Sequence, residues 1–205
     1  LAADDHVQRH FDTEHPWPAL RAALVTSAVL LDAKTILNGG KPMEAGQVIT
    51  RADIERMIQE QGLVQRGIAA GDVVYIRTGW GERWQDPDTD KVYYSKAPGL
   101  SYDAAQYLGE RRAVAVGLDT PFIDPVPEGL LQGKAQPAEG TPPGMPFAVH
   151  HYLITQAGIH HIENANLDAM ANDKVWTSCT MVLPLREKGG AGSAVRPVAI
   201  GVPGQ

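Results

Sequence analysis

The stretch GDVVYIRTGW, residues 71–80, combines a turn, a strand and a loop within ten positions. Gly71 and Asp72 are typical of a turn, and the β-branched and aromatic run after them predicts a strand over Val73–Arg77. Arg77 and Trp80 follow at the carboxyl end of this strand, where open α/β folds bind ligands. Arg77 can hold a carboxylate and Trp80 can stack on a ring. A structural ion pair and a packed indole are the alternatives.

Strands and helices alternate on both sides of this stretch. The other predicted strands are Ala23–Asp32, Ala113–Leu118, Ile159–Glu163, Thr177–Leu185 and Val195–Val202. The predicted helices are Thr50–Gln61, Tyr102–Arg111 and Phe147–Ala157, the first two capped by Thr50 and Ser101. This order predicts a single α/β domain over residues 23–205, preceded by an irregular arm over residues 1–22. The proline- and glycine-rich residues 124–146 predict a long loop, of the kind that often carries function.

Composition excludes several classes of protein. The chain has 205 residues, and its 43% of hydrophobic residues is enough for a buried core. A net charge of −6 is the opposite of what a nucleic-acid surface needs. The apolar runs are too short to cross a bilayer and no signal peptide is visible, so we expect a cytoplasmic protein without a membrane partner. Cys179 stands alone, which excludes an intrachain disulfide, and its place in a strand pattern favours a core position.

Histidines concentrate near the C-terminal third of the chain, where His150 and His151 are followed by His160, His161 and Glu163. Imidazole and carboxylate groups bind zinc or manganese and also act as general acids and bases near neutral pH. If the first pair lies on a helix and the second on a strand, His161 and Glu163 point to one face of the strand and His160 to the other. A cluster of surface histidines on a turn is the alternative.

Two further features carry polar side chains that suit a functional site. His6, His10 and Asp12 in the arm have the spacing His-x-x-x-His-x-Asp, which can converge on a metal ion or belong to a solvated loop. Asp119 follows the predicted strand Ala113–Leu118, where it can orient a histidine, fix a loop or cap a turn.

Six segments together resemble one family. They are GDVVYIRTGW at 71–80, PGLS at 98–101, VGLDTP at 116–121, HHYLITQAGIHHIEN at 150–164, and the closing segments at 183–185 and 192–200. In order and spacing, residues 25–202 resemble the cyclase family of metal-dependent hydrolases, which includes kynurenine formamidase and isatin hydrolase.

The resemblance implies a swivelling β/β/α fold with a mixed central sheet flanked by helices, assembled as a homodimer or homotetramer. It implies zinc or manganese, and hydrolysis of an amide, formamide or cyclic amide C–N bond in a small molecule through metal-activated water. Glu163 matches a metal ligand, with either His150 or His151 as its partner. Trp80 and Phe122 match positions that can line an apolar substrate pocket, although formamidases often have a small polar residue at the position of Phe122.

The arm departs from the family's N-terminal motif, His-x-Gly-Thr-His-x-Asp-x-Pro-x-His. His6, His10 and Asp12 match the first three ligand positions, but Gln8-Arg9 replaces Gly-Thr. Pro16 occupies the final histidine position, and His15, one place earlier, is a candidate proton shuttle. Either the arm is a degenerate metal motif, or the true motif lies upstream and is absent. The predicted function is therefore a metal-dependent amide hydrolase, with a non-catalytic or truncated relative that serves as a binding or assembly module as the alternative.

Overall fold

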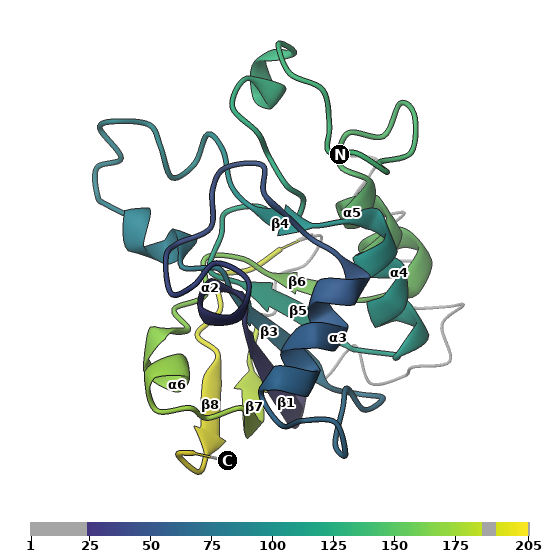
Figure 1. Ribbon diagram of the computed structural model, residues 1–205, viewed down its shortest axis with the longest axis vertical. Coiled ribbons are helices and arrows are strands. Elements are labelled where there is room, and N and C mark those ends of the chain that lie inside the picture. Colours follow the sequence, from purple (N-terminus) through teal and green to yellow (C-terminus); the bar gives the residue numbers. More distant parts are fainter. Residues whose placement is uncertain (1–23, 186–191, 205) are drawn as a thin grey trace.

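The computed structural model describes residues 24–185 and 192–204, and these form a mixed six-stranded sheet flanked by helices (Figure 1). The strands, in the order β6-β5-β3-β1-β7-β8, are β6 (His160–Ile162), β5 (Ala115–Leu118), β3 (Val73–Arg77), β1 (Leu24–Asp32), β7 (Thr177–Val182) and β8 (Val198–Gly201). The strands from β6 to β1 are parallel, and β7 and β8 are antiparallel to their neighbours. The prediction of an α/β fold with a mixed central sheet is confirmed.

The two main helices begin where their capping residues predict. Thr50 and Asp53 form a reciprocal capping box at the start of α3 (Arg51–Glu60), and the Ser101 side chain accepts a hydrogen bond from the Ala104 amide at the start of α4 (Tyr102–Glu110). The apolar faces of both helices pack over one face of the sheet, including its central strands β1, β3 and β5. This packing fixes the layer from which the candidate site is built.

Several short elements were not predicted from the sequence. They are α2 (Ala33–Ile36), the parallel pair β2 (Val48–Ile49) and β4 (Gly99–Leu100), and the single-turn helices η2 (Trp80–Arg83) and η3 (Leu130–Gln132). The strands β5, β7 and β8 are shorter than predicted, as is β6. Elements of two to four residues leave no periodicity in a sequence, because one turn or two paired residues cannot repeat a pattern.

The opposite face of the sheet is covered in part by α6 (Asp168–Asn172). The predicted core position of Cys179 is wrong, because its side chain is exposed. Cys179 lies in β7 between Ser27 of β1 and Ile200 of β8, and Ile200 is itself 63% exposed. The residues of the six-stranded sheet that are buried under the helices come from β1, β3 and β5. Among the described residues, none of them comes from β7 or β8, so the side chains of Cys179 and Ile200 stay exposed to solvent.

Parallel pairing brings the carboxyl ends of β1, β3, β5 and β6 to one end of the sheet. The side chains at or just after these ends are Asp32, Arg77, Asp119 and Glu163. Figure 1 shows the long connections after β3 and β5 extending from this end. Polar groups that are far apart in the sequence therefore meet where ligands bind in open α/β folds.

The predictions for the N-terminal arm and for the oligomeric state are not tested by residues 24–185 and 192–204. The arm's candidate residues His6, His10, Asp12 and His15 lie outside the described residues. The structure holds one chain, so the homodimer or homotetramer stays a prediction. No helix in residues 24–185 and 192–204 is long and apolar enough to cross a membrane.

Gly117 is expected to be essential for packing in the middle of the sheet. A Cβ atom there would lie 2.6 Å from Cδ1 of Tyr75, and the Tyr75 hydroxyl is held 2.8 Å from Thr180 Oγ1 on β7. Gly117→Ala should therefore lower the free energy of unfolding by about 1–3 kcal/mol, as overpacking does in cores. Urea denaturation measures the change, and Gly192→Ala, where a Cβ meets nothing within 4 Å, should shift it by less than about 0.5 kcal/mol. An equal effect of both substitutions would contradict this packing argument.

Candidate metal centre

A short helix and the edge strand β6 carry the histidine cluster. The helix α5 (Ala148–His151) continues into a π-helical segment, Tyr152–Ala157, before the chain turns into β6. In β6, His161 pairs with Val116, which belongs to the helix-covered cluster, and His160 pairs with Ala115 of the opposite cluster. His161 and Glu163 therefore face α5 and His160 faces away, as the alternation in the sequence predicted.

His150, His161 and Glu163 come together at this place. Each offers one nitrogen or oxygen atom, and these atoms all lie within 4.8 Å of one another. Nε2 of His150 is 3.1 Å from Oε1 of Glu163, and the rings of His150 and His161 meet edge to face with centroids 4.6 Å apart. Two imidazoles and one carboxylate are the ligand set of many catalytic zinc sites, which keep a further position open.

One buried atom of this cluster lacks a hydrogen-bond partner among the described residues. Nε2 of His161 is buried and makes no hydrogen bond, whereas the buried Oε1 of Glu163 is faced by Nε2 of His150 at 3.1 Å. An unsatisfied buried polar atom costs about 1–3 kcal/mol, so such atoms usually have a ligand to satisfy them. The three residues therefore fit a divalent metal ion, which would take up the unpaired Nε2 of His161.

The two clustered histidines have pKa values shifted in opposite directions. Burial of the His150 ring acts to lower its pKa, but the carboxylates of Asp124 and Glu163 outweigh burial and raise the pKa to about 9. Burial lowers the pKa of His161 to about 3, with smaller contributions from the positive charges of His150 and His160. His161 is therefore neutral at physiological pH, the form in which imidazole donates its lone pair to a metal.

Of the two histidines left open as partners of Glu163, the structure brings His150 to the carboxylate. His151 is exposed and lies outside the cluster. His161 was not predicted as a ligand, although its spacing of two residues from Glu163 on a strand contained the signal. The roles of His150 and Glu163 as ligands remain predictions.

The three residues predicted for the substrate pocket lie outside the metal cluster; they are Arg77, Trp80 and Phe122. Arg77 is buried and pairs with Asp168, with Nη2 2.7 Å from Oδ1, which agrees with the structural alternative. Trp80 is also buried, and its Nε1 donates to the Tyr93 carbonyl at 3.3 Å while Phe122 packs against the same cluster. None of the three belongs to the metal cluster or lines the pocket described below.

Asp119 fixes the loop after β3. Its Oδ1 accepts hydrogen bonds from the amide and hydroxyl of Thr78 at 2.8 and 2.6 Å, and its Oδ2 accepts from the Gly79 amide at 2.8 Å. Burial raises the pKa of the Asp119 carboxyl, although the hydrogen bonds from Thr78 and Gly79 act in the opposite direction. Of the roles left open by the sequence, loop fixation is the one that the contacts support.

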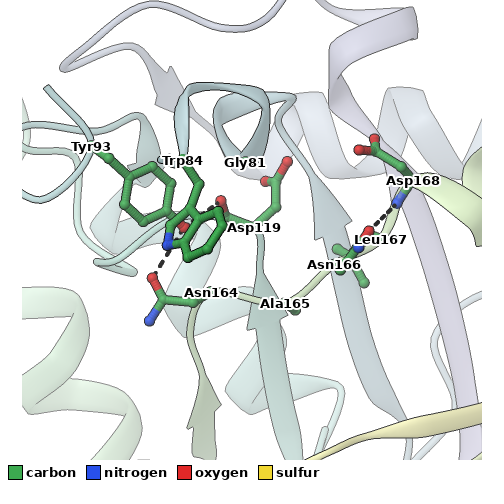
Figure 2. Close-up of a pocket in the computed structure, with 9 residues that line it drawn as sticks. All are labelled: Gly81, Trp84, Tyr93, Asp119, Asn164, Ala165, Asn166, Leu167 and Asp168. Carbon is green, nitrogen blue, oxygen red and sulfur yellow. Dashed lines mark hydrogen bonds between the residues drawn. The ribbon is translucent and has the colours of Figure 1, made fainter. Parts of the chain in front are cut away.

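A pocket of about 180 Å³ opens at the carboxyl end of β6, and His150, His161 and Glu163 are not among the residues that line it (Figure 2). Trp84 and Tyr93 lie at one end of it and Asp168 at the other, and Asn164, the residue after Glu163, lies between them. The Tyr93 hydroxyl donates to Oδ1 of Asn164 at 3.0 Å. Burial raises the pKa of Tyr93, with help from the negative charges of Asp119 and Glu163, so the hydroxyl stays a neutral donor.

The fold and the cluster define an α/β protein with a candidate His–His–Glu metal centre at the ends of its parallel strands. Residues 6–125 match a family model described as a putative cyclase, and the chain belongs to this family. The matched range includes His6, His10 and Asp12 of the arm. The predicted family resemblance is confirmed.

Solved structures agree with this assignment. A structure described as a novel cyclase is 25% identical with a TM-score of 0.67, over 86% of this chain and 53% of that one. An isatin hydrolase bound to the product analogue thioisatinate is 22% identical, with a TM-score of 0.64 over 88% and 61% of the two chains. A potential metal-dependent hydrolase with cyclase activity is 21% identical, with a TM-score of 0.53 over 86% and 65%.

The present chain spans between about half and two thirds of the length of these structures. No curated protein matches it.

Proposed function

We propose that this chain is a metal-dependent hydrolase that cleaves the C–N bond of a small amide, formamide or lactam. The observation that carries the proposal is the cluster of His150, His161 and Glu163, in which the buried Nε2 of His161 has no hydrogen-bond partner among the described residues. Family membership supports it, since solved relatives include an isatin hydrolase and a potential metal-dependent hydrolase. Zinc and manganese both suit this donor set.

The cluster would hold the ion through Nε2 of His150, Nε2 of His161 and Oε1 of Glu163. When bound, a divalent ion lowers the pKa of water and polarises a carbonyl, which is the chemistry that amide hydrolysis needs. The chain's own contribution is to keep His161 neutral by burial and to place a carboxylate between two imidazoles. With three protein ligands, a position remains for water or substrate.

The pocket at the carboxyl end of β6 supports a small substrate. Its volume of about 180 Å³ is below the roughly 300–1,000 Å³ of sites for drug-sized ligands. Trp84, 55% exposed, offers a face for a planar ring, and the Tyr93 hydroxyl and Asn164 amide offer hydrogen bonds that would orient a carbonyl or an N–H group. Isatin, the substrate named for one of the solved relatives, is a small planar cyclic amide.

Hydrolysis can be tested with aryl formamides and isatin-type lactams on protein loaded with zinc or manganese. We expect metal-dependent turnover of at least one of these classes, lost after dialysis against a chelator and restored when the metal is returned. A protein that carries a full equivalent of metal and hydrolyses none of them would contradict the proposed activity. That outcome would favour a relative that keeps the fold as a binding module.

A further inference from the structure

Asp124 lies behind His150, on the side away from Glu163. The carboxylate is 2% exposed and comes from the segment after β5, 26 residues from the histidine it contacts. Oδ1 of Asp124 accepts a hydrogen bond from the Val149 amide at 2.8 Å, and Oδ2 accepts one from the His150 amide at 3.1 Å. Oδ2 also contacts Nδ1 of the His150 ring within hydrogen-bond distance.

These contacts do two things at once. The residue at the N-cap of α5, Phe147, makes no side-chain capping bond, so Asp124 satisfies the first amides of the helix from a distant segment. Because an ionised carboxylate has only acceptor atoms, the ring nitrogen Nδ1 must carry the hydrogen in this contact. When a metal displaces the hydrogen on the other ring nitrogen, the lone pair is on Nε2, which faces Glu163 at 3.1 Å.

The backbone that carries Asp124 is itself held closely. The Leu100 amide donates to the Ile123 carbonyl at 2.9 Å, and Ala97 and Val126 exchange hydrogen bonds of 2.9 and 2.8 Å. At Gly99, a Cβ atom would lie 2.3 Å from the carbonyl carbon of Asp124, so only glycine permits this approach. The position of the carboxylate is thus set by β4 and its flanking residues rather than by the long loop that follows.

We propose that Asp124 is a positioning residue for the metal centre, which fixes the rotamer and tautomer of His150 so that Nε2 points at the ion. The role rests on the proposed function, because it concerns a ligand of that same site. Outer partners of this kind orient metal-binding histidines, and their loss typically weakens metal binding 10–100-fold.

The informative substitution is Asp124→Asn, which keeps the size of the side chain. The two amides and the ring N–H are all donors, and asparagine offers only one acceptor oxygen, so one of these contacts must be lost. We expect the dissociation constant for zinc, measured by competition with a chromophoric chelator, to rise about 10–100-fold. Asp124→Ser is a second variant that removes the carboxylate, and we expect a similar loss of zinc affinity.

The matched control is Asp72→Asn. Asp72 is an equally buried carboxylate that accepts the Ala69 amide at 2.7 Å and pairs with Arg66 and Ser27, just before the amino end of β3. Its substitution should destabilise the protein and leave the zinc dissociation constant within about twofold. In ¹⁵N spectra of the zinc-loaded protein, the His150 ring should carry its hydrogen on Nδ1, and Asp124→Asn should change this signal, whereas Asp72→Asn should not.

Three results would overturn the role of Asp124. The first is unchanged zinc affinity in both Asp124 variants, and the second is an equal loss in Asp72→Asn. Either leaves the proposed function intact as long as the unmodified protein binds zinc. The third is failure of the unmodified protein to bind zinc or manganese, which overturns the proposed function and the positioning role together.

Discussion

Substitution of Glu163 by glutamine is expected to remove bound metal and hydrolysis together. Glutamine keeps the shape of the side chain but replaces a buried anionic oxygen, 3.1 Å from His150 Nε2, with a neutral amide. The loss should exceed that caused by removing an outer partner, so zinc affinity should fall at least about 100-fold. Because a bound ion contributes several kcal/mol to hydrolysis and each 1.4 kcal/mol is tenfold in rate, turnover should also fall at least about 100-fold.

Elemental analysis after gel filtration and a turnover assay on the same sample measure both effects of Glu163→Gln. The control is Glu60→Gln on the exposed side of α3, where Glu60 pairs with Arg56 at 2.7 Å. It should keep metal and turnover near the values of the unmodified protein. Retention of a full equivalent of metal by Glu163→Gln would show that Glu163 is not a ligand.

Replacement of His161 by leucine is expected to change stability and metal binding in opposite directions. Without metal, Nε2 of His161 is buried and unpaired, and removal of such an atom in favour of an apolar group relieves a cost of about 1–3 kcal/mol. The metal-free variant should therefore unfold at higher urea concentration than the metal-free unmodified protein. Zinc affinity should nevertheless fall at least about 100-fold, because an inner ligand contributes more than an outer partner does.

A rise in stability together with a fall in zinc affinity distinguishes a functional site from a packing defect. If His161 served only stability, its replacement would lower both the free energy of unfolding and the zinc affinity, or change neither. Residues of functional sites, in contrast, commonly lower stability in favour of activity. His151→Leu tests the alternative ligand left open by the sequence. Its ring is exposed and outside the cluster, so metal should be retained. Loss of metal from His151→Leu together with retention in His161→Leu would contradict the assigned geometry.

The parts of the fold that were predictable are those with a local signal. The strand Val73–Arg77 is bounded by a turn and a glycine-containing loop, and its bounds agree with β3. The helix α3 begins after Thr50 because its capping box lies within four residues. The paired elements β2 and β4 carried no such signal, since two-residue strands become strands only through each other.

In the candidate site, too, only the features with a local sequence signal were predictable. That His161 and Glu163 share a face follows from the alternation of a strand, whereas the contact of Asp124 with His150 depends on how β5 and α5 pack. Trp80 and Trp84 are four residues apart, and only the turn of η2 decides that Trp80 is buried while Trp84 lines the pocket. Exposure of Cys179 was also decided beyond its own strand, by where the helices end over the sheet.

The central claim is that His150, His161 and Glu163 hold a divalent ion. The most direct measurement is the zinc and manganese content of the purified chain, determined by elemental analysis after incubation with each metal and removal of the excess. The account predicts about one tightly held equivalent per chain at this three-ligand site, lost in Glu163→Gln. Absence of both metals from the unmodified chain, or an equal content in Glu163→Gln, would contradict it.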